Sequence, residues 1–293
     1  MKRIKLLFLL ILCIPASAQT QLGADIDGEA AFDRSGSSVS LSSDGTRVAI
    51  GASLNDGNGT TAGHVRIYEY SAGSWTQLGA DIDGEALEDY SGCSVSLSSG
   101  GDTVAIGASS NDGAGGNAGH ARIYEYSAGS WTQLGADIDG EATGDRSGSS
   151  VSLSADGTRV AVGARYNNGA GTGAGHVRIY EYSAGSWTQL GADIDGEAVN
   201  DESGFSVSLS SDGTTVAIGA HWNGGAGASA GHVRIYEYSA GSWTQLGADI
   251  DGEAAGDYSG SSVSLSSDGT TAAIEAYRTH ANGPDVCILV IDE

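Results

Sequence analysis

Short segments of apolar and polar residues, separated by turn residues, make up this chain. Four segments of the first unit read as β-strands by their alternation or apolar content: 37–41, 48–50, 64–70 and 75–82. An Asp-Gly pair at 44–45 and an Ala-Gly-Ser stretch at 72–74 are typical of tight hairpin turns. Nowhere does a helical period of 3.6 extend over ten residues or more. The pattern therefore predicts an all-β fold.

The four-strand pattern recurs every 56 residues. Trp75, Trp131, Trp187 and Trp243 mark the period, and the residues between them repeat in register. Four evenly spaced strands per unit are typical of a β-propeller blade. A solenoid is the weaker alternative, because it needs capping units that differ from the rest. The predicted organisation is a signal peptide at 1–18 and a five-bladed β-propeller domain over 19–293, with repeats at about 20–75, 76–131, 132–187, 188–243 and 244–293.

The two ends of the chain predict how the propeller closes. The fifth unit lacks the hairpin residues equivalent to 238–243, so its last strand needs another partner. We expect residues 20–23 to pair antiparallel with residues 286–291 and close the ring, which removes two exposed sheet edges. The fifth unit is degenerate, with residues 287–290 standing where 231–234 lie in the fourth. A truncated member of a larger array would look similar.

The first residues have the features of a secretory signal. A basic start precedes the apolar run 6–14, and Ala16-Ser17-Ala18 resembles a small-residue cleavage site. The run is shorter than the roughly 20 residues of a spanning helix, so we predict export to the cell surface or medium without membrane insertion. The net charge of −24 excludes nucleic acid as a partner, because such binding depends on Lys and Arg neutralising phosphates.

Three recurring motifs resemble a known family. Each of the first four units has a Ser-Gly pair, as at 35–36, then a segment such as Val-Ala-Ile-Gly-Ala at 48–52, then one such as Gly-His-Val-Arg-Ile-Tyr at 63–68. They resemble the FG-GAP repeat of integrin-alpha-type propellers, and the resemblance extends to all five units. It implies an extracellular or cell-surface propeller that binds other molecules. The family's calcium loop is not carried over, because segment 42–46 keeps only one carboxylate.

A repeated acidic cluster between units is the strongest candidate for a metal site. Several carboxylates in one loop suit Ca²⁺, which takes about 6 to 8 oxygen ligands. The alternative is a solvated loop that keeps a Gly-rich secreted protein soluble. The candidate calcium ligands are Asp25, Asp27, Glu29, Asp33, Asp81, Asp83, Glu85, Asp89, Asp137, Asp139, Glu141, Asp145, Asp193, Asp195, Glu197, Asp201, Asp249, Asp251, Glu253 and Asp257. The recurring residues His64, His120, His176 and His232 are interpreted as structural, and the repeated Trp residues as packing between blades.

Variation among the units points to one face of the propeller as a ligand site. Alternating strand directions bring the hypervariable loop after the second strand and the loop between units to the same face. Such loops carry binding function on rigid scaffolds, and drift in unconstrained loops is the alternative. Aromatic and cationic residues, which are enriched at interface hot spots, gather beside these loops in units three to five. The predicted ligand-binding residues are Arg165, Tyr166, His221, Trp222, Tyr277 and Arg278.

Three classes of function fit this sequence. The preferred interpretation is a secreted or cell-surface binding or adhesion module without catalysis, whose partner is an extracellular protein or glycan. It rests on the even distribution of acids over the units, since an enzyme usually needs one asymmetric site. The alternative is a propeller hydrolase or lyase that acts on polysaccharide with acidic residues of the loop face. A structural surface-layer role is the third option.

Overall fold

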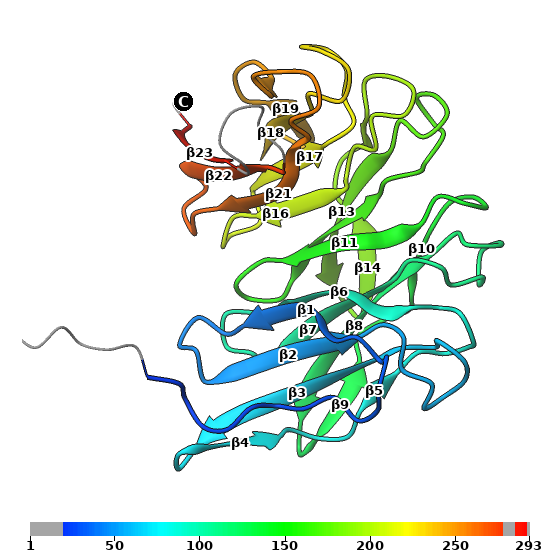
Figure 1. The fold of residues 1–293 in the computed structure, drawn as a ribbon, viewed down its shortest axis with the longest axis vertical. Helices are drawn as coiled ribbons and strands as arrows, with labels where there is room; N and C mark the ends of the chain where they lie inside the picture. The colour runs from blue at the N-terminus through cyan, green and yellow to red at the C-terminus, as the bar shows by residue number, and fades with distance from the viewer. Residues whose placement is uncertain (1–19, 278–284, 292–293) are drawn as a thin grey trace, which may run out of the picture.

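The computed structural model describes residues 20–277 and 285–291, so the predicted signal peptide lies outside the described residues. The described residues form β-strands, turns and loops, and among them no helix is long and apolar enough to cross a membrane. Five antiparallel sheets are arranged around a common centre as the blades of a five-bladed β-propeller (Figure 1). The predicted fold class is confirmed.

Blades 1 to 4 share one plan. Three strands pair in chain order, and two short strands both pair with the third. Blade 1 comprises β1 (Ser35–Leu41), β2 (Arg47–Ala52), β3 (His64–Ser71), β4 (Ser74–Gln77) and β5 (Ile82–Asp83). Blade 2 comprises β6 (Ser91–Leu97), β7 (Thr103–Ala108), β8 (His120–Ser127), β9 (Ser130–Gln133) and β10 (Ile138–Asp139).

The remaining blades follow in chain order. Blade 3 comprises β11 (Ser147–Leu153), β12 (Arg159–Ala164), β13 (His176–Ser183), β14 (Ser186–Gln189) and β15 (Ile194–Asp195). Blade 4 comprises β16 (Ser206–Leu209), β17 (Thr215–Ala220), β18 (His232–Ser239), β19 (Ser242–Gln245) and β20 (Ile250–Asp251). Blade 5 contains three strands among the described residues: β21 (Ser259–Leu265), β22 (Thr271–Ala276) and β23 (Asp285–Val290).

The first hairpin of blade 1 turns at an Asp-Gly pair that recurs in blades 3, 4 and 5, whereas blade 2 has a Gly-Gly pair there. Gly45 takes the positive φ of 71° that the turn requires. Asp44 Oδ1 accepts hydrogen bonds from the Thr46 N–H at 2.9 Å and from Ser42 Oγ at 2.7 Å. These bonds, the backbone one first, lower the pKa of Asp44 to about 2. This carboxylate therefore serves the turn.

Successive blades pack through the two sides of each first strand. Val95 and Leu97 of β6 lie buried against Val65 and Ile67 of blade 1. The polar side of β6 faces the other neighbour, blade 3, where Ser96 Oγ accepts the Leu153 N–H at 2.9 Å. This explains why apolar residues alternate with Ser along these strands. The buried clusters between blades form the core, so burial of apolar surface holds the blades together.

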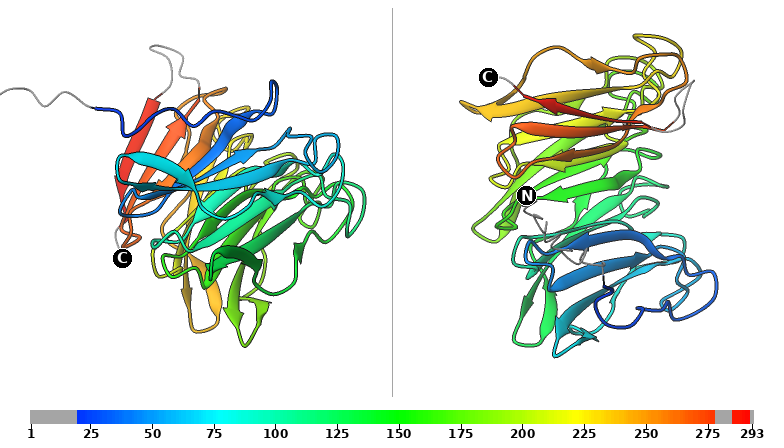
Figure 2. Two further views of the ribbon diagram at one scale, coloured as in Figure 1. Left: turned by 90° about the horizontal axis from the view of Figure 1, so that it is seen from below. Right: turned by 60° about the vertical axis from the view of Figure 1, so that its left-hand side comes forward.

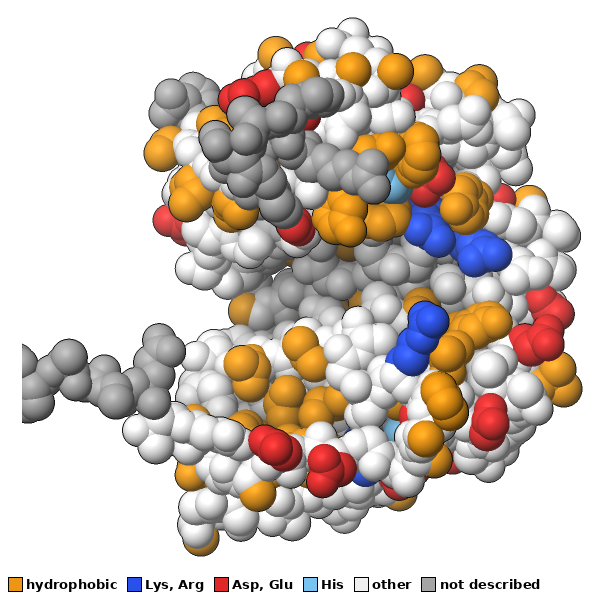
Figure 3. Space-filling view, in the orientation of Figure 1, with side chains coloured by type: hydrophobic (Ala, Val, Ile, Leu, Met, Phe, Trp, Pro, Cys, Tyr) orange, Lys and Arg blue, Asp and Glu red, His pale blue; other side chains and the backbone are white. Residues whose placement is uncertain are grey.

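In the described part of the chain, one face of each terminal blade has no neighbouring blade packed on it. Val39 and Leu41 of β1 are 63% and 60% exposed, whereas their counterparts Val95 and Leu97 in β6 are 9% and 7% exposed. At the other end, Ile288 of β23 is 71% exposed. The space-filling view shows a notch between the first and last blades (Figure 3). Each side of the notch presents half of the packing surface that inner blades share.

The predicted closure by the N-terminal segment is not found. Residues 20–23 form no strand, and no pairing in the described part of the chain joins them to β23. Instead the segment lies along blade 1, where the Leu22 carbonyl accepts a hydrogen bond from Trp75 Nε1 at 2.8 Å. The same bond joins Leu78 to Trp131 at 2.7 Å. The repeated Trp residues therefore dock each unit on the preceding segment, which confirms packing between blades.

Strand β23 adopts another register than the alignment of repeats predicts. Ile288 lies opposite Ala273, as Ile235 lies opposite Ala217 in blade 4. The repeat alignment instead equates Ile288 with His232. The observed register places Val286 and Ile288 at the positions of the apolar pair in β18, so the apolar side of the strand is kept. Two further views show β23 at the edge of its sheet (Figure 2).

Candidate functional site

The repeat loses its symmetry at one end of the propeller centre. Successive first strands contact one another around this centre. We call the end where first strands begin and second strands end the mouth. The residues just before the first strands share a positive φ of 54° to 56° but differ in chemistry: Arg34, Tyr90, Arg146, Glu202 and Tyr258. The residues just after the second strands differ likewise: Ser53, Ser109, Arg165, His221 and Tyr277. The backbone conformation at the mouth is therefore similar in all five blades, while the pair of side chains that each blade places there differs.

Aromatic residues form a pocket of about 370 Å³ on the blade 4 and blade 5 side of the mouth. Its lining consists of Phe205, His221, Trp222, Tyr258, Ser261 and Tyr277. The Trp222 and Tyr258 rings meet edge to face with centroids 5.3 Å apart. Trp222 is 44% exposed, so the pocket opens to solvent. Hydrophobic side chains gather beside Lys or Arg side chains on this face (Figure 3).

Arg165 joins this pocket to a charged neighbour. Its guanidinium lies 4.7 Å from the Tyr166 ring centroid and 5.3 Å from that of Phe205. Its Nη1 lies 4.0 Å from Glu202 Oε2, while its buried Nε has no hydrogen-bond partner. Burial raises the pKa of Glu202, and the guanidinium groups of Arg165 and Arg146 oppose that rise. The Arg165 guanidinium is therefore a cation with at least one N–H donor that has no hydrogen-bond partner.

His221 is a side chain of the pocket wall whose pKa is strongly lowered. Its ring lies 3.7 Å from that of Phe205, and its buried Nδ1 has no hydrogen-bond partner. Burial first, and then the Arg165 charge, lower the pKa of His221 to about 4. At neutral pH this imidazole is uncharged and can accept a proton.

The lowered pKa makes stability depend on pH. The unfolded chain binds a proton on His221 near the ordinary value of about 6.5, whereas the folded chain does so only near 4. We expect this contribution to be present above pH 6.5 and to be lost as the pH falls through about 4. Urea unfolding across this range should show a steeper loss for the wild type than for His221→Gln, by at most about 1.4 kcal/mol per pH unit. Parallel curves would contradict the assignment.

The structure brings together five of the six predicted ligand-binding residues. Arg165, Tyr166, His221, Trp222 and Tyr277 all lie at the mouth, and Arg278 lies outside the described residues. The sequence reasoning missed Phe205, Tyr258, Glu202 and Arg146, which come from the starts of the first strands. A signal was present, because Phe205 stands where three sister units have Ser.

A second hollow of about 360 Å³ lies on the blade 1 and blade 2 side of the mouth. Arg34, Tyr90, Cys93, Asp112 and Arg146 are among its lining residues. It combines charges of both signs with one aromatic ring and lacks the aromatic wall of the first pocket. Blades 3 to 5 therefore hold the more specialised side of the mouth.

The four acids of each predicted calcium cluster do not converge on one point in the structure. Asp89 is buried, and its Oδ2 accepts bonds from Asn111 Nδ2 and the Ala86 N–H, so it serves the loop. The side chain of Asp83 is exposed. Among the described residues, converging ligand atoms instead form four triads from two loops and one strand: Glu29–His64–Asp81, Glu85–His120–Asp137, Glu141–His176–Asp193 and Glu197–His232–Asp249. Calcium binding by these loops stays a prediction.

Comparison with known proteins yields matches in structure alone. No family model and no curated protein matches the chain, so FG-GAP stays a resemblance. The fold is similar to a periplasmic gluconolactonase of Pseudomonas aeruginosa, with TM-score 0.60, 18% identity and coverage of 88% of this chain and 68% of that one.

Two further structures are more distant. A Kuenenia stuttgartiensis hydrazine synthase matches with TM-score 0.48, 13% identity and coverage of 87% of this chain and 84% of that one. A Bacteroides uniformis protein assigned as a 6-phosphogluconolactonase matches with TM-score 0.48, 11% identity and coverage of 88% and 86%.

The prediction of a binding or adhesion module without catalysis is corrected. It rested on the even distribution of acids, yet a protein named as a gluconolactonase has this fold. The mouth is also asymmetric, because Arg165, His221 and most aromatic residues of the pocket replace the residues that blades 1 and 2 have at the equivalent positions.

Proposed function

We propose that this protein is an exported hydrolase that opens a sugar-derived lactone at the mouth. The observation that carries the proposal is the uncharged, buried His221 in the wall of the aromatic pocket, beside the Arg165 guanidinium. The similarity to the gluconolactonase concerns the fold and supports the proposal only as a precedent.

The pocket suits a compact ring with one apolar face. Its volume of about 370 Å³ is that of a small-molecule site, and Trp222 and Tyr258 present rings at nearly right angles, 84°. Sugar rings stack on such aromatic faces through their C–H groups. The open side of the pocket, where Tyr277 is 58% exposed, leaves room for hydroxyl substituents in water.

The residues present can perform ester hydrolysis by water. The His221 imidazole takes a proton from a water molecule whose oxygen attacks the lactone carbonyl carbon. The Arg165 guanidinium stabilises the negative charge that develops on the carbonyl oxygen. The tetrahedral intermediate collapses with cleavage of the bond between this carbon and the ring oxygen, which takes the proton back from His221. The product is a hydroxy acid that loses its carboxyl proton to solvent.

The pocket favours a lactone over a polysaccharide. Glycoside hydrolysis ordinarily uses two carboxyl groups on either side of the scissile bond. The described lining of the aromatic pocket contains no Asp or Glu, and Glu202 contributes one carboxylate outside that lining, 4.0 Å from Arg165 Nη1. A cyclic ester needs one base and one oxyanion partner, which His221 and Arg165 supply.

The proposal is tested by following acid release from glucono-1,5-lactone in a pH-stat, against the spontaneous rate. We expect the purified protein to accelerate opening, with kcat/KM constant at neutral pH and falling as the pH drops through about 4, where His221 becomes protonated. Soluble polysaccharides, assayed for new reducing ends, serve as the comparison. Acceleration of polysaccharide cleavage without lactone opening would contradict the proposal, as would no acceleration of either.

A further inference from the structure

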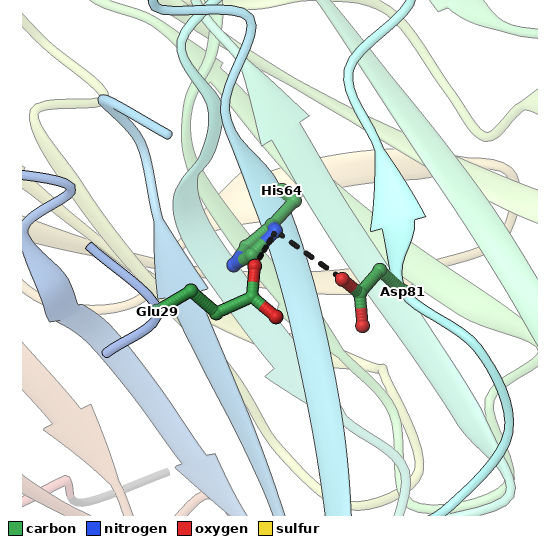
Figure 4. A group of neighbouring side chains, drawn as sticks. All are labelled: Glu29, His64 and Asp81. Carbon is green, nitrogen blue, oxygen red and sulfur yellow. Dashed lines mark ion pairs between the residues drawn. The ribbon is translucent and has the colours of Figure 1, made fainter. Parts of the chain in front are cut away.

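Four side-chain triads recur away from the mouth, one in each of the first four units. In the first, His64 begins β3, while Glu29 and Asp81 reach it from separate loops (Figure 4). His64 Nδ1 lies 3.8 Å from Glu29 Oε2 and 3.7 Å from Asp81 Oδ2. The imidazole-to-aspartate distances in the other triads are 3.7, 3.7 and 3.9 Å. The geometry is thus a property of the repeat.

The carboxylates are held so that one oxygen of each faces the imidazole. Asp81 Oδ1 accepts a hydrogen bond from Gln77 Nε2 at 2.6 Å, which leaves Oδ2 directed at His64. Glu29 Oε1 lies 3.7 Å from Arg66 Nη1, which leaves Oε2 directed at the same ring. The Gln contact recurs in the other three triads at 2.6, 2.6 and 2.7 Å. Outer partners that orient ligands in this way are typical of metal sites.

The four imidazoles are buried, and one of them lacks hydrogen-bond partners on both ring nitrogens. His176 is 1% exposed, and neither Nδ1 nor Nε2 has a hydrogen-bond partner. A separation of 3.7 Å between Nδ1 and Asp193 Oδ2 is too long for a direct hydrogen bond. Leaving a buried polar atom without a partner is unfavourable, so Nδ1 of His176 requires an occupant that the side chains do not supply.

The spacing fits a small divalent cation. Two ligands that each lie about 2.1 Å from a tetrahedral ion are roughly 3.4 Å apart, so the imidazole and aspartate ligands need approach by only a few tenths of an ångström, and the exposed glutamate, within 4.8 Å of both, completes the triad. One imidazole nitrogen and two carboxylate oxygens are a donor set for zinc, whereas calcium takes oxygen ligands.

We propose that each of the four triads binds one Zn²⁺ ion through the imidazole Nδ1 and one oxygen of each carboxylate, with water completing the coordination. Among its described residues blade 5 has no such site, because β23 begins at Asp285, at the position where blades 1 to 4 have His. The glutamate belongs to the segment that enters the blade, so the ion ties that segment to the blade. Bound ions therefore stabilise the folded protein by mass action.

The test is the number of zinc ions retained per chain after equilibrium dialysis, measured by atomic absorption. We expect about four for the wild type, about three for Asp81→Asn, and none for the combined Asp81→Asn, Asp137→Asn, Asp193→Asn and Asp249→Asn variant. Asn keeps the oxygen that accepts the Gln bond, so folding should persist, as circular dichroism will verify. Asp83→Asn, an exposed acid two residues from Asp81, is the matched control and should keep four.

Each other outcome counts against the proposal. Retention of zinc by the fourfold variant would place the ions on scattered surface acids, and no retention by the wild type would mean that the triads bind no zinc. Displacement of zinc by equimolar calcium would overturn the mixed nitrogen and oxygen site. If the fourfold variant does not fold, Glu29→Gln, whose residue is 45% exposed, replaces it and should lose one ion. None of these measurements depends on lactone hydrolysis.

Discussion

His221→Gln is expected to lower kcat/KM for lactone opening by about 100-fold or more while the fold is kept. A positioned base contributes roughly 10²–10⁴ to the rate of a proton-transfer step, and Gln keeps polarity and approximate size but cannot take the proton. The loss should appear in kcat, because the aromatic pocket that binds the ring is retained. Rates above the spontaneous background, measured in a pH-stat at pH 7, decide the result.

The control for this variant is Ser109→Ala. Ser109 occupies the position in blade 2 that His221 occupies in blade 4, on the other side of the mouth. Its replacement should leave kcat/KM unchanged. Equal losses in both variants would indicate a general disturbance of the mouth, and full activity of His221→Gln would remove the base from the mechanism.

Gly107→Ala should destabilise the protein by about 3 kcal/mol or more, near the upper end for overpacked sites. A Cβ at Gly107 of β7 would overlap the Gly148 carbonyl oxygen of the next blade and Ser94 Oγ. The obstacle on one side is backbone, so the blades would have to move apart. Urea unfolding measures the change in the free energy of unfolding.

Gly116→Ala separates this packing effect from the general cost of replacing Gly. Its φ is not positive, and the nearest atom to its added Cβ is Thr143 Cγ2 at 3.9 Å. The expected change is within about 0.5 kcal/mol. If the two variants were equally stable, close approach of Gly backbones would not set the spacing of the blades.

Strand positions followed from local pattern, because each strand's alternation reflects its two packed sides. The predicted strand at 48–50 became β2 and that at 64–70 became β3 with small extensions. The single strand predicted at 75–82 is divided into β4 and β5, since the Leu78 carbonyl turns to bind the indole of Trp131. A contact between units decides that break, and no pattern within one unit reveals it.

Closure of the ring and the location of the proposed catalytic site could not be predicted from the repeat pattern. Whether residues 20–23 reach β23 depends on the angle between neighbouring blades. Side-chain packing sets this angle at each interface between blades. The expected absence of catalysis was inferred from acids, which the repeat distributes evenly. The proposed catalytic site rests instead on His221 and Arg165, two departures from the repeat that become informative only because the fold brings them together at the mouth.

The two uncovered terminal faces have a consequence for access to the aromatic pocket. In a chain of repeated units, stability is approximately a sum of unit terms and neighbour terms, so blade 5 has one neighbour term where blade 4 has two. The pocket wall is divided between them, with Trp222 on blade 4 and Tyr258 and Tyr277 on blade 5. Local opening begins where fewest contacts must be given up. Local unfolding of blade 5 would therefore separate the two sides of the pocket. Ligand entry and the first step of unfolding would then involve the same movement of blade 5 away from blade 4.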